Sequence, residues 1–156
     1  MHYPSTVRYE GMLAPPRDVV REQIMALQRA MAPVQGIPPE PEHHFARGMY
    51  ARALTIPAGM VVVGKHHKHE HFVFVAKGRA VIVSEFGRQE VEAGFIAVSP
   101  PGIKRAVYAH EDTMFVTLHL NPTDTQDMVQ VEAEHIEPES AEDQALLDAY
   151  RKEISQ

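Results

Sequence analysis

The chain has 156 residues, 44% of them hydrophobic and 23% charged, with a formal net charge of −6 and no cysteine. This length fits one ordinary globular domain, and the absence of cysteine excludes a disulfide framework, thiol catalysis and cysteine-ligated metal sites. The negative charge argues against nucleic acid or an anionic membrane surface as a partner. No apolar run is long enough to span a membrane and residues 1–13 show no secretory signal, so we expect a cytoplasmic protein.

The first predicted element is an amphipathic helix over residues 17–31. Its apolar residues recur at offsets that place them on one helical face, and Pro15-Pro16 provides a natural start. Residues 32–42 hold several prolines and a glycine, which predict a linker without regular structure. The first predicted part of the chain is therefore residues 1–42, an N-terminal helix followed by a proline-rich linker.

Residues 43–122 are predicted to form a β barrel. Short segments rich in β-branched and aromatic residues are separated by turn signals, among them Pro57-Ala58-Gly59, Lys77-Gly78 and Ala93-Gly94. Short strands with a turn after roughly every eight to twelve residues are typical of an antiparallel sandwich or a small barrel.

The last part, residues 123–156, is predicted to be an acidic loop and a C-terminal helix over residues 141–154. Ser140 is a suitable N-cap for this helix. Four apolar residues recur on one side of it: Leu146, Leu147, Tyr150 and Ile154. The predicted β core thus carries one helix at each end.

Histidines are concentrated in the segment Gly64-Lys65-His66-His67-Lys68-His69-Glu70-His71. Imidazole is the commonest metal ligand in proteins. Strand residues four apart lie about 13 Å from each other, so His67 and His71 can share one ion only if the chain bends between them. A metal site with such a bend and an exposed polar turn are both open interpretations. The other histidines are assigned no metal: His43, His44 and His110 are expected in loops or at the surface, and His2 and His135 are given no role.

The histidine-rich segment resembles the first motif of the cupin superfamily: glycine, five residues, His-x-His, three or four residues, Glu, six residues, glycine. Gly59, Lys65, His67, His71 and Gly78 fall on this frame without a gap. The resemblance implies a mainly β fold, the cupin-type double-stranded β-helix or jelly-roll barrel, here with short N- and C-terminal helices.

Residues 94–109 are similar to the second cupin motif: glycine, five residues, Pro-x-Gly, two residues, His, three residues, Asn. Gly94, Pro100-Pro101-Gly102, Arg105 and Ala109 occupy its positions. Arg105 stands where the resemblance implies a metal-binding His, and an arginine that stays protonated cannot ligate a metal. The standard site is therefore either remodelled or lost.

A remodelled site would use His67 and His71 with a third group. His119 is the first choice for this group, and its strand parity would place it beside Thr117; His69 and Glu70 are the alternatives. The expected cofactor is a divalent transition metal, namely zinc, iron, manganese or nickel.

A small anionic molecule is the expected ligand. The cupin frame would place Lys65 and Arg105 at the mouth of the barrel, where two cations beside imidazoles favour a carboxylate or a phosphate. Glu70 and Tyr108, together with Tyr50, are further candidates to line this mouth.

Four stretches also resemble small cupin-like proteins encoded by tailed phages and prophages: residues 43–52, 56–59, 99–105 and 108–113. For a phage-encoded protein, the expected cytoplasm would be that of the host cell. This resemblance implies no activity. Three functions therefore stay open: a metal-dependent cupin enzyme, a binding module without turnover, and a structural or assembly protein. We expect a homodimer, because exposed strand edges need to be covered.

Overall fold

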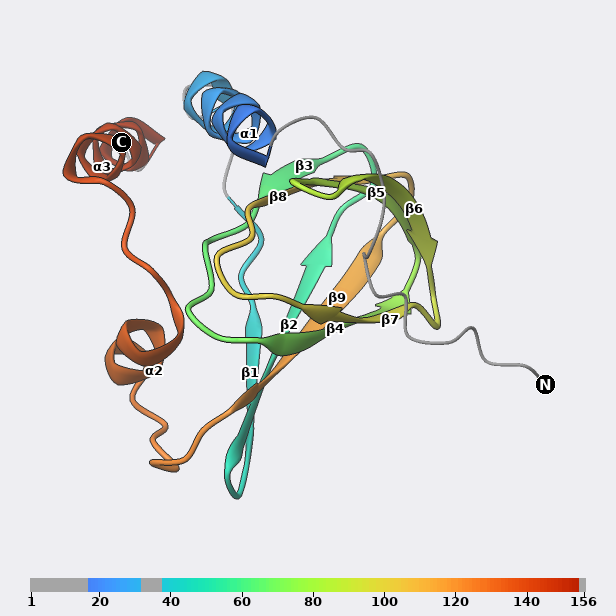
Figure 1. Cartoon of the computed structure of the whole chain (residues 1–156), viewed down its shortest axis with the longest axis vertical. Coiled ribbons are helices and arrows are strands. Elements are labelled where there is room, and N and C mark those ends of the chain that lie inside the picture. The colour runs from blue at the N-terminus through green and yellow to red at the C-terminus, as the bar shows by residue number, and fades with distance from the viewer. Residues whose placement is uncertain (1–16, 32–37, 155–156) are drawn as a thin grey trace.

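The computed structural model describes residues 17–31 and 38–154 of this chain, which form one β barrel flanked by helices (Figure 1). Helix α1 (Arg17–Met31) and helix α3 (Ala141–Ile154) have the predicted bounds, and α2 (Met128–His135) lies between the barrel and α3. The strands, in chain order, are β1 (Glu42–Ala46), β2 (Met49–Ile56), β3 (Val61–Val63), β4 (His71–Lys77), β5 (Arg79–Ser84), β6 (Gly87–Glu92), β7 (Ile96–Ser99), β8 (Arg105–Ala109) and β9 (Thr113–Leu120).

Two antiparallel sheets face each other, with strand orders β1-β2-β9-β4-β7 and β3-β8-β5-β6. The late strand β9 lies between β2 and β4, and β8 lies between β3 and β5. Of these nine strands, the eight from β2 to β9 are divided between the two sheets in the order of a jelly roll, and β1 adds a strand at the edge beside β2. The predicted fold class, a cupin-type jelly-roll barrel with added helices, is therefore confirmed by the strand order of this chain.

The structure refines two local predictions. Strand β1 begins at Glu42, the last residue of the predicted linker, and His43 and His44 lie on this strand because residues 42–46 pair with β2 across the turn at Gly48. Both histidines are exposed, as expected. The acidic segment after residue 122 is not only a loop, since it contains α2, whose first turn is capped by the side chain of Asp127.

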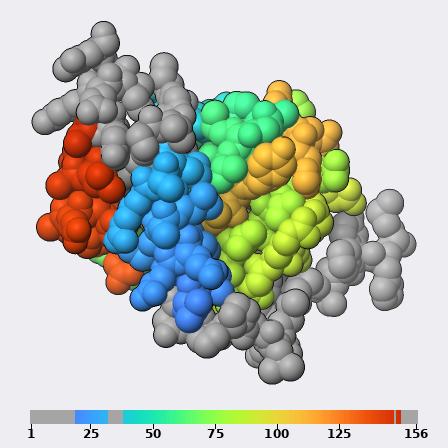
Figure 2. Space-filling model, turned by 90° about the horizontal axis from the view of Figure 1, so that it is seen from above, coloured from blue at the N-terminus to red at the C-terminus, as the bar shows by residue number. Residues whose placement is uncertain are grey.

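Helix α1 covers the outer face of the four-stranded sheet. Val20 and Ile24 are buried against Ala106 of β8. Figure 2 shows α1 lying between the strands and α3, and ion pairs from Arg21 to Glu85 and from Arg29 to Asp143 hold it there. None of the helices in the described ranges is long and apolar enough to cross a membrane. His2 and Pro15-Pro16 lie outside the described residues.

The outer face of the five-stranded sheet is more exposed. Phe72 of β4 and Ile96 of β7 keep 45% and 49% of their surface accessible. Their neighbours across the sheet are also apolar, since Phe72 pairs with Val98 and with Leu118. The expected homodimer stays a prediction.

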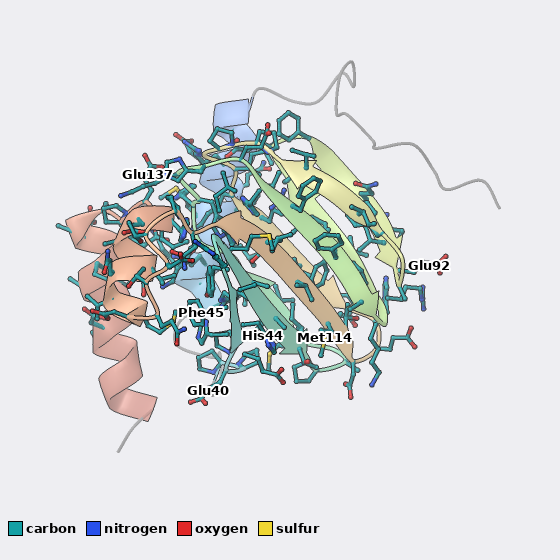
Figure 3. The ribbon with its side chains drawn as sticks, turned by 90° about the horizontal axis from the view of Figure 1, so that it is seen from below. Glu40, His44, Phe45, Glu92, Met114 and Glu137 are labelled. Atoms are coloured by element: carbon teal, nitrogen blue, oxygen red, sulfur yellow. The ribbon has the colours of Figure 1, made fainter. Side chains whose placement is uncertain are left out.

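The barrel interior has two chemically different ends. One end is filled by a buried apolar cluster: Ile56, Val75, Ala80, Ile82, Val91, Ala109 and Phe115. The other end carries the imidazoles described below. In Figure 3, Glu92 at the end of β6 and Glu137 just after α2 mark these two ends on opposite sides of the barrel.

Candidate metal centre

Two imidazoles enter the barrel from neighbouring strands of the five-stranded sheet. His71 is the first residue of β4 and His119 is near the end of β9, and the pairing of Phe72 with Leu118 brings the two histidines level with each other. Side chains alternate along a strand, so both rings point to the inner face, together with Thr117. Nε2 of His119 lies 3.0 Å from Oγ1 of Thr117, which agrees with the expected parity.

The third imidazole comes from a segment outside the regular strands. His67 forms a single antiparallel bridge with Ile136, and its carbonyl oxygen accepts a 2.8 Å hydrogen bond from the backbone N–H of Gly102. The chain then bends at Lys68 and His69 before β4 begins. This bend brings His67 back over His71, which a fully extended segment would not allow.

The three rings form one compact group. Ring centroids are 4.2 Å apart for His67 and His71, 4.6 Å for His71 and His119, and 5.1 Å for His67 and His119. One ring nitrogen from each histidine lies within 4.8 Å of those of the other two. His71 and His119 are each only 4% exposed, so the group is enclosed by protein.

The hydrogen bonding of His71 fits a metal ligand. Its Nδ1 lies 3.1 Å from the carbonyl oxygen of His69. A carbonyl can only accept a hydrogen bond, so this contact places the ring proton on Nδ1 and leaves the lone pair on Nε2. That Nε2 is buried and has no hydrogen-bond partner among residues 17–31 and 38–154. At metal sites the ring nitrogen that does not bind the metal usually donates to a carbonyl or carboxylate, which fixes the tautomer of the histidine. Without a metal, a buried nitrogen that lacks a partner costs free energy.

Burial keeps all three imidazoles neutral. Desolvation is the largest cause for each one, and it lowers the pKa of His67 to about 2, of His119 to about 3 and of His71 to about 4. The positive charge of Arg105 lowers the pKa values of His67 and His71 further, and Arg52 acts in the same direction on His67 and His119. Neutral imidazoles have the lone pairs that a divalent transition metal requires.

Two arginines share this end of the barrel. Arg105 donates from Nη2 to Oγ of Ser99 at 2.7 Å, and Ser99 pairs with His71 across β4 and β7. Arg52 pairs with Thr117 across β2 and β9, and burial lowers its pKa without removing its charge. Arg52 was not predicted as a site residue. It lies two residues after Tyr50 on the same face of β2, which can be recognised only once the bounds and pairing of β2 are known.

The other predicted ligand contacts lie away from the three rings. Lys65 is exposed and forms an ion pair with Glu132 of α2. Glu70 is exposed in the turn before β4, and the exposed ring of His69 is outside the group of three. Tyr108 is on the outer face of β8, the face that Ala106 presents to α1, so its expected place at the barrel mouth is wrong.

A fourth histidine was missed. His135, which was given no role, is buried at the end of α2, with its ring 5.1 Å from that of His119. Tyr50 stacks on both rings, at 5.7 Å from His119 and 5.9 Å from His135. The sequence offered one hint: His135 follows the apolar Val131 by four residues, and such residues share one face of a helix. It went unused because α2 itself was not predicted.

Comparison with known proteins finds no matching family model and no matching curated protein. Solved structures with a similar fold include KdgF from a Halomonas species, at 17% sequence identity and a TM-score of 0.47, over 57% of this chain and 81% of that one. A cupin-2 domain protein from Shewanella frigidimarina has 15% identity and a TM-score of 0.45, over 56% of this chain and 86% of its own. An RmlC-like cupin protein from Desulfovibrio desulfuricans has 22% identity and a TM-score of 0.45, over 52% and 81%. These likenesses assign no ligand or reaction, and the phage resemblance stays a prediction.

Proposed function

We propose that this chain binds a divalent transition-metal ion through His67, His71 and His119 and holds a small anion beside it. The observation that carries the proposal is the enclosed group of three neutral imidazoles, with ring nitrogens within 4.8 Å of one another. The unpartnered Nε2 of His71 supports it, because a bound ion would satisfy that buried lone pair. Three imidazole ligands suit zinc, iron and nickel, and manganese in mixed sites.

The charge balance of the site supports an anionic ligand. The imidazoles are neutral, so a divalent ion would add its full charge to an environment that already includes Arg52 and Arg105. A carboxylate or a phosphate would offset this excess and could accept hydrogen bonds from a guanidinium. A bound metal would act as a Lewis acid on an oxygen of such an anion. The proposed function is binding of metal and anion, and no reaction is assigned to it.

Metal titration tests the first half of the proposal. Protein freed of metal with a chelator is expected to bind about one Zn²⁺ per chain, and His71→Leu is expected to lose this binding, because it removes one of three ligands. His69→Ala is the matched control, since His69 is exposed on the same segment and lies outside the group of three. Wild-type protein without zinc uptake, or equal uptake by His71→Leu, would contradict the proposal.

Anion titration tests the second half. Metal-loaded protein is titrated with acetate and with inorganic phosphate, in the wild type and in Arg105→Gln. We expect the variant to keep the metal and to bind the preferred anion roughly 10-fold more weakly, because one charge-assisted contact is lost. Arg88→Gln is the control, since Arg88 is exposed on β6 and paired with Glu90. Equal anion affinity in the wild type and Arg105→Gln would remove Arg105 from the site.

A further inference from the structure

Helix α2 brings a fourth imidazole to the end of the barrel that holds the other three. His135 is 6% exposed, and its Nε2 is buried without a hydrogen-bond partner in the part of the chain that the structure describes. Its ring lies 5.1 Å from the ring of His119 and 6.4 Å from that of His69. It is nevertheless outside the group whose nitrogens lie within 4.8 Å of one another, so it is not placed as a member of the metal-binding set.

The backbone that carries His135 is joined to the backbone that carries His67. The carbonyl oxygen of His135 accepts a 2.8 Å hydrogen bond from the N–H of Lys68, and the N–H of Glu137 donates to the carbonyl oxygen of His66 at 2.9 Å. These bonds flank the bridge between His67 and Ile136. The segment that carries the proposed ligand His67 is therefore bonded to the C-terminal end of α2. This fixes the position of His135 relative to the three rings.

Apart from the backbone bonds at its C-terminal end and a hydrogen bond from Nζ of Lys68 to the carbonyl oxygen of Ala133, helix α2 has few side-chain contacts with the barrel. Within α2 only Val131 and His135 are buried, and Val129 is 80% exposed. The ion pair of Glu132 with Lys65 is at the surface, where such pairs contribute little. Burying an imidazole nitrogen without a partner costs free energy, so its presence at this position needs an explanation.

Tyr50 fixes the ring of His135 from the side. It is 3% exposed, stacks on the rings of His119 and His135, and its hydroxyl lies 2.8 Å from Nδ1 of His43. The tyrosine is thus held by β1 and in turn supports both imidazoles. A ring that is stacked on one face and has a buried nitrogen without a partner among the described residues is available to contact a molecule that enters the site.

We propose that His135 contacts the anion held at the three-histidine centre, and that α2 is the cap which brings this contact to the mouth of the barrel. The inference rests on the proposed function, because it requires the metal and the anion. A neutral imidazole has one N–H, and Nε2 would donate it to an oxygen of the anion. His135 then selects for ligands that have an acceptor on the side facing α2.

Cobalt and acetate test the inference on the full chain. Co²⁺ affinity and acetate affinity are measured separately from the visible absorption of the Co²⁺-loaded protein. We expect His135→Ala to keep Co²⁺ affinity within about threefold of the wild type and to weaken acetate binding roughly 10- to 100-fold, as for loss of a hydrogen bond to a charged group. His135→Gln, with an amide N–H donor, is expected to recover part of the acetate affinity.

Val131→Ala is the matched control, because Val131 is the other buried side chain of α2 and does not belong to the three-ring group. An acetate loss in Val131→Ala as large as in His135→Ala would assign the effect to the packing of α2 and overturn the inference. Equal acetate affinity in the wild type and His135→Ala would also overturn it, as would a parallel loss of Co²⁺. Wild-type protein that takes up no Co²⁺ would overturn the proposed function, and this inference with it, before acetate is added.

Discussion

The two ends of the barrel are made by the same strands and have opposite chemistry. On β9, His119 faces the interior at one end and Phe115 at the other, and on β4 the corresponding residues are His71 and Val75. Each pair is four residues apart, which is about 13 Å along a strand. The alternation of a strand decides which side chains face inward, and the residue type then decides what each end can do.

Because of this difference, one end of the domain contributes to its stability and the other end carries the proposed binding site. The apolar end holds a packed cluster that includes Ile56, Val75 and Phe115, each at most 9% exposed. The other end keeps a buried nitrogen on His71 and another on His135, both without a hydrogen-bond partner among the described residues. Such groups lower stability, and a domain can hold them only if the rest of its interior provides the stability they remove. Four predictions test this separation.

Acid is expected to have the largest effect, and it acts through the imidazole end. The pKa values of His67, His119 and His71 fall from 6.5 to about 2, 3 and 4 on folding. Below pH 6.5 the unfolded chain therefore takes up protons that the folded chain does not, so stability is complete above this pH and is lost as the pH falls. Each group contributes up to about 1.4 kcal/mol per pH unit. Metal-free protein is expected to unfold between about pH 6 and pH 4, measured by urea unfolding at a series of pH values.

The control for this prediction is His71→Leu, which removes one of the three groups. Its unfolding free energy is expected to depend less steeply on pH than that of the wild type, because one group whose pKa is lowered by burial is gone. A wild-type stability that stays constant from about pH 7 to pH 4 would show that these imidazoles are not kept neutral in the folded chain.

Truncation at the apolar end is expected to come next. Phe115→Ala should lower the free energy of unfolding by about 3–5 kcal/mol, because it leaves a cavity in the buried cluster. Zinc stoichiometry is expected to stay at about one per folded chain, since the three ligands are at the other end. Urea unfolding and zinc titration of the same sample measure the two effects. A loss of zinc binding in folded Phe115→Ala would mean that the two ends are coupled.

The turn at the apolar end is expected to be nearly as sensitive. Gly78 has a φ of +85°, and an added Cβ would lie 2.6 Å from Oγ1 and 2.7 Å from Cα of Thr113. We expect Gly78→Ala to lower the free energy of unfolding by about 3 kcal/mol, from backbone strain and this overlap together. Gly87→Ala is the control, because its φ is +111° but nothing lies within 4 Å of the added atom, and it should cost about 1 kcal/mol. If urea unfolding shows that Gly78→Ala and Gly87→Ala lose equal free energy of unfolding, overlap with Thr113 is not the cause of the loss in Gly78→Ala.

Local signals predicted the elements that local chemistry controls. The bounds of α1 and α3 follow from apolar periodicity and from Ser140, which accepts a hydrogen bond from the N–H of Asp143 at 3.1 Å. Turn glycines and motif spacing predicted the barrel, since a glycine such as Gly78 with positive φ fixes where strands reverse. The grouping of His67 with His71 followed from the bend that they need in order to share an ion. The addition of His119 followed from its parity on its strand.

The missed residues depend on contacts between distant segments. Helix α2 has a weakly amphipathic, acidic sequence, and its position depends on backbone bonds to residues 66–68, more than 60 positions earlier. His135 is buried only because α2 lies there. Arg52 joins the site only through the pairing of β2 with β9, which no local pattern in β2 reveals. The expected role of Lys65 changed for the same reason, because its partner Glu132 is on the helix that was not predicted.

The smallest expected effect is a gain in stability at the imidazole end. His71→Leu replaces a buried nitrogen without a partner by an apolar side chain, so the metal-free variant should be more stable than the wild type by about 1 kcal/mol at neutral pH. Excess Zn²⁺ should stabilise the wild type and leave the variant unchanged, because only the wild type retains the site. Thermal unfolding with and without zinc measures both differences. If His71→Leu instead lost about as much stability as Phe115→Ala, His71 would belong to the packed core, and the division of the barrel into a stabilising end and a binding end would be wrong.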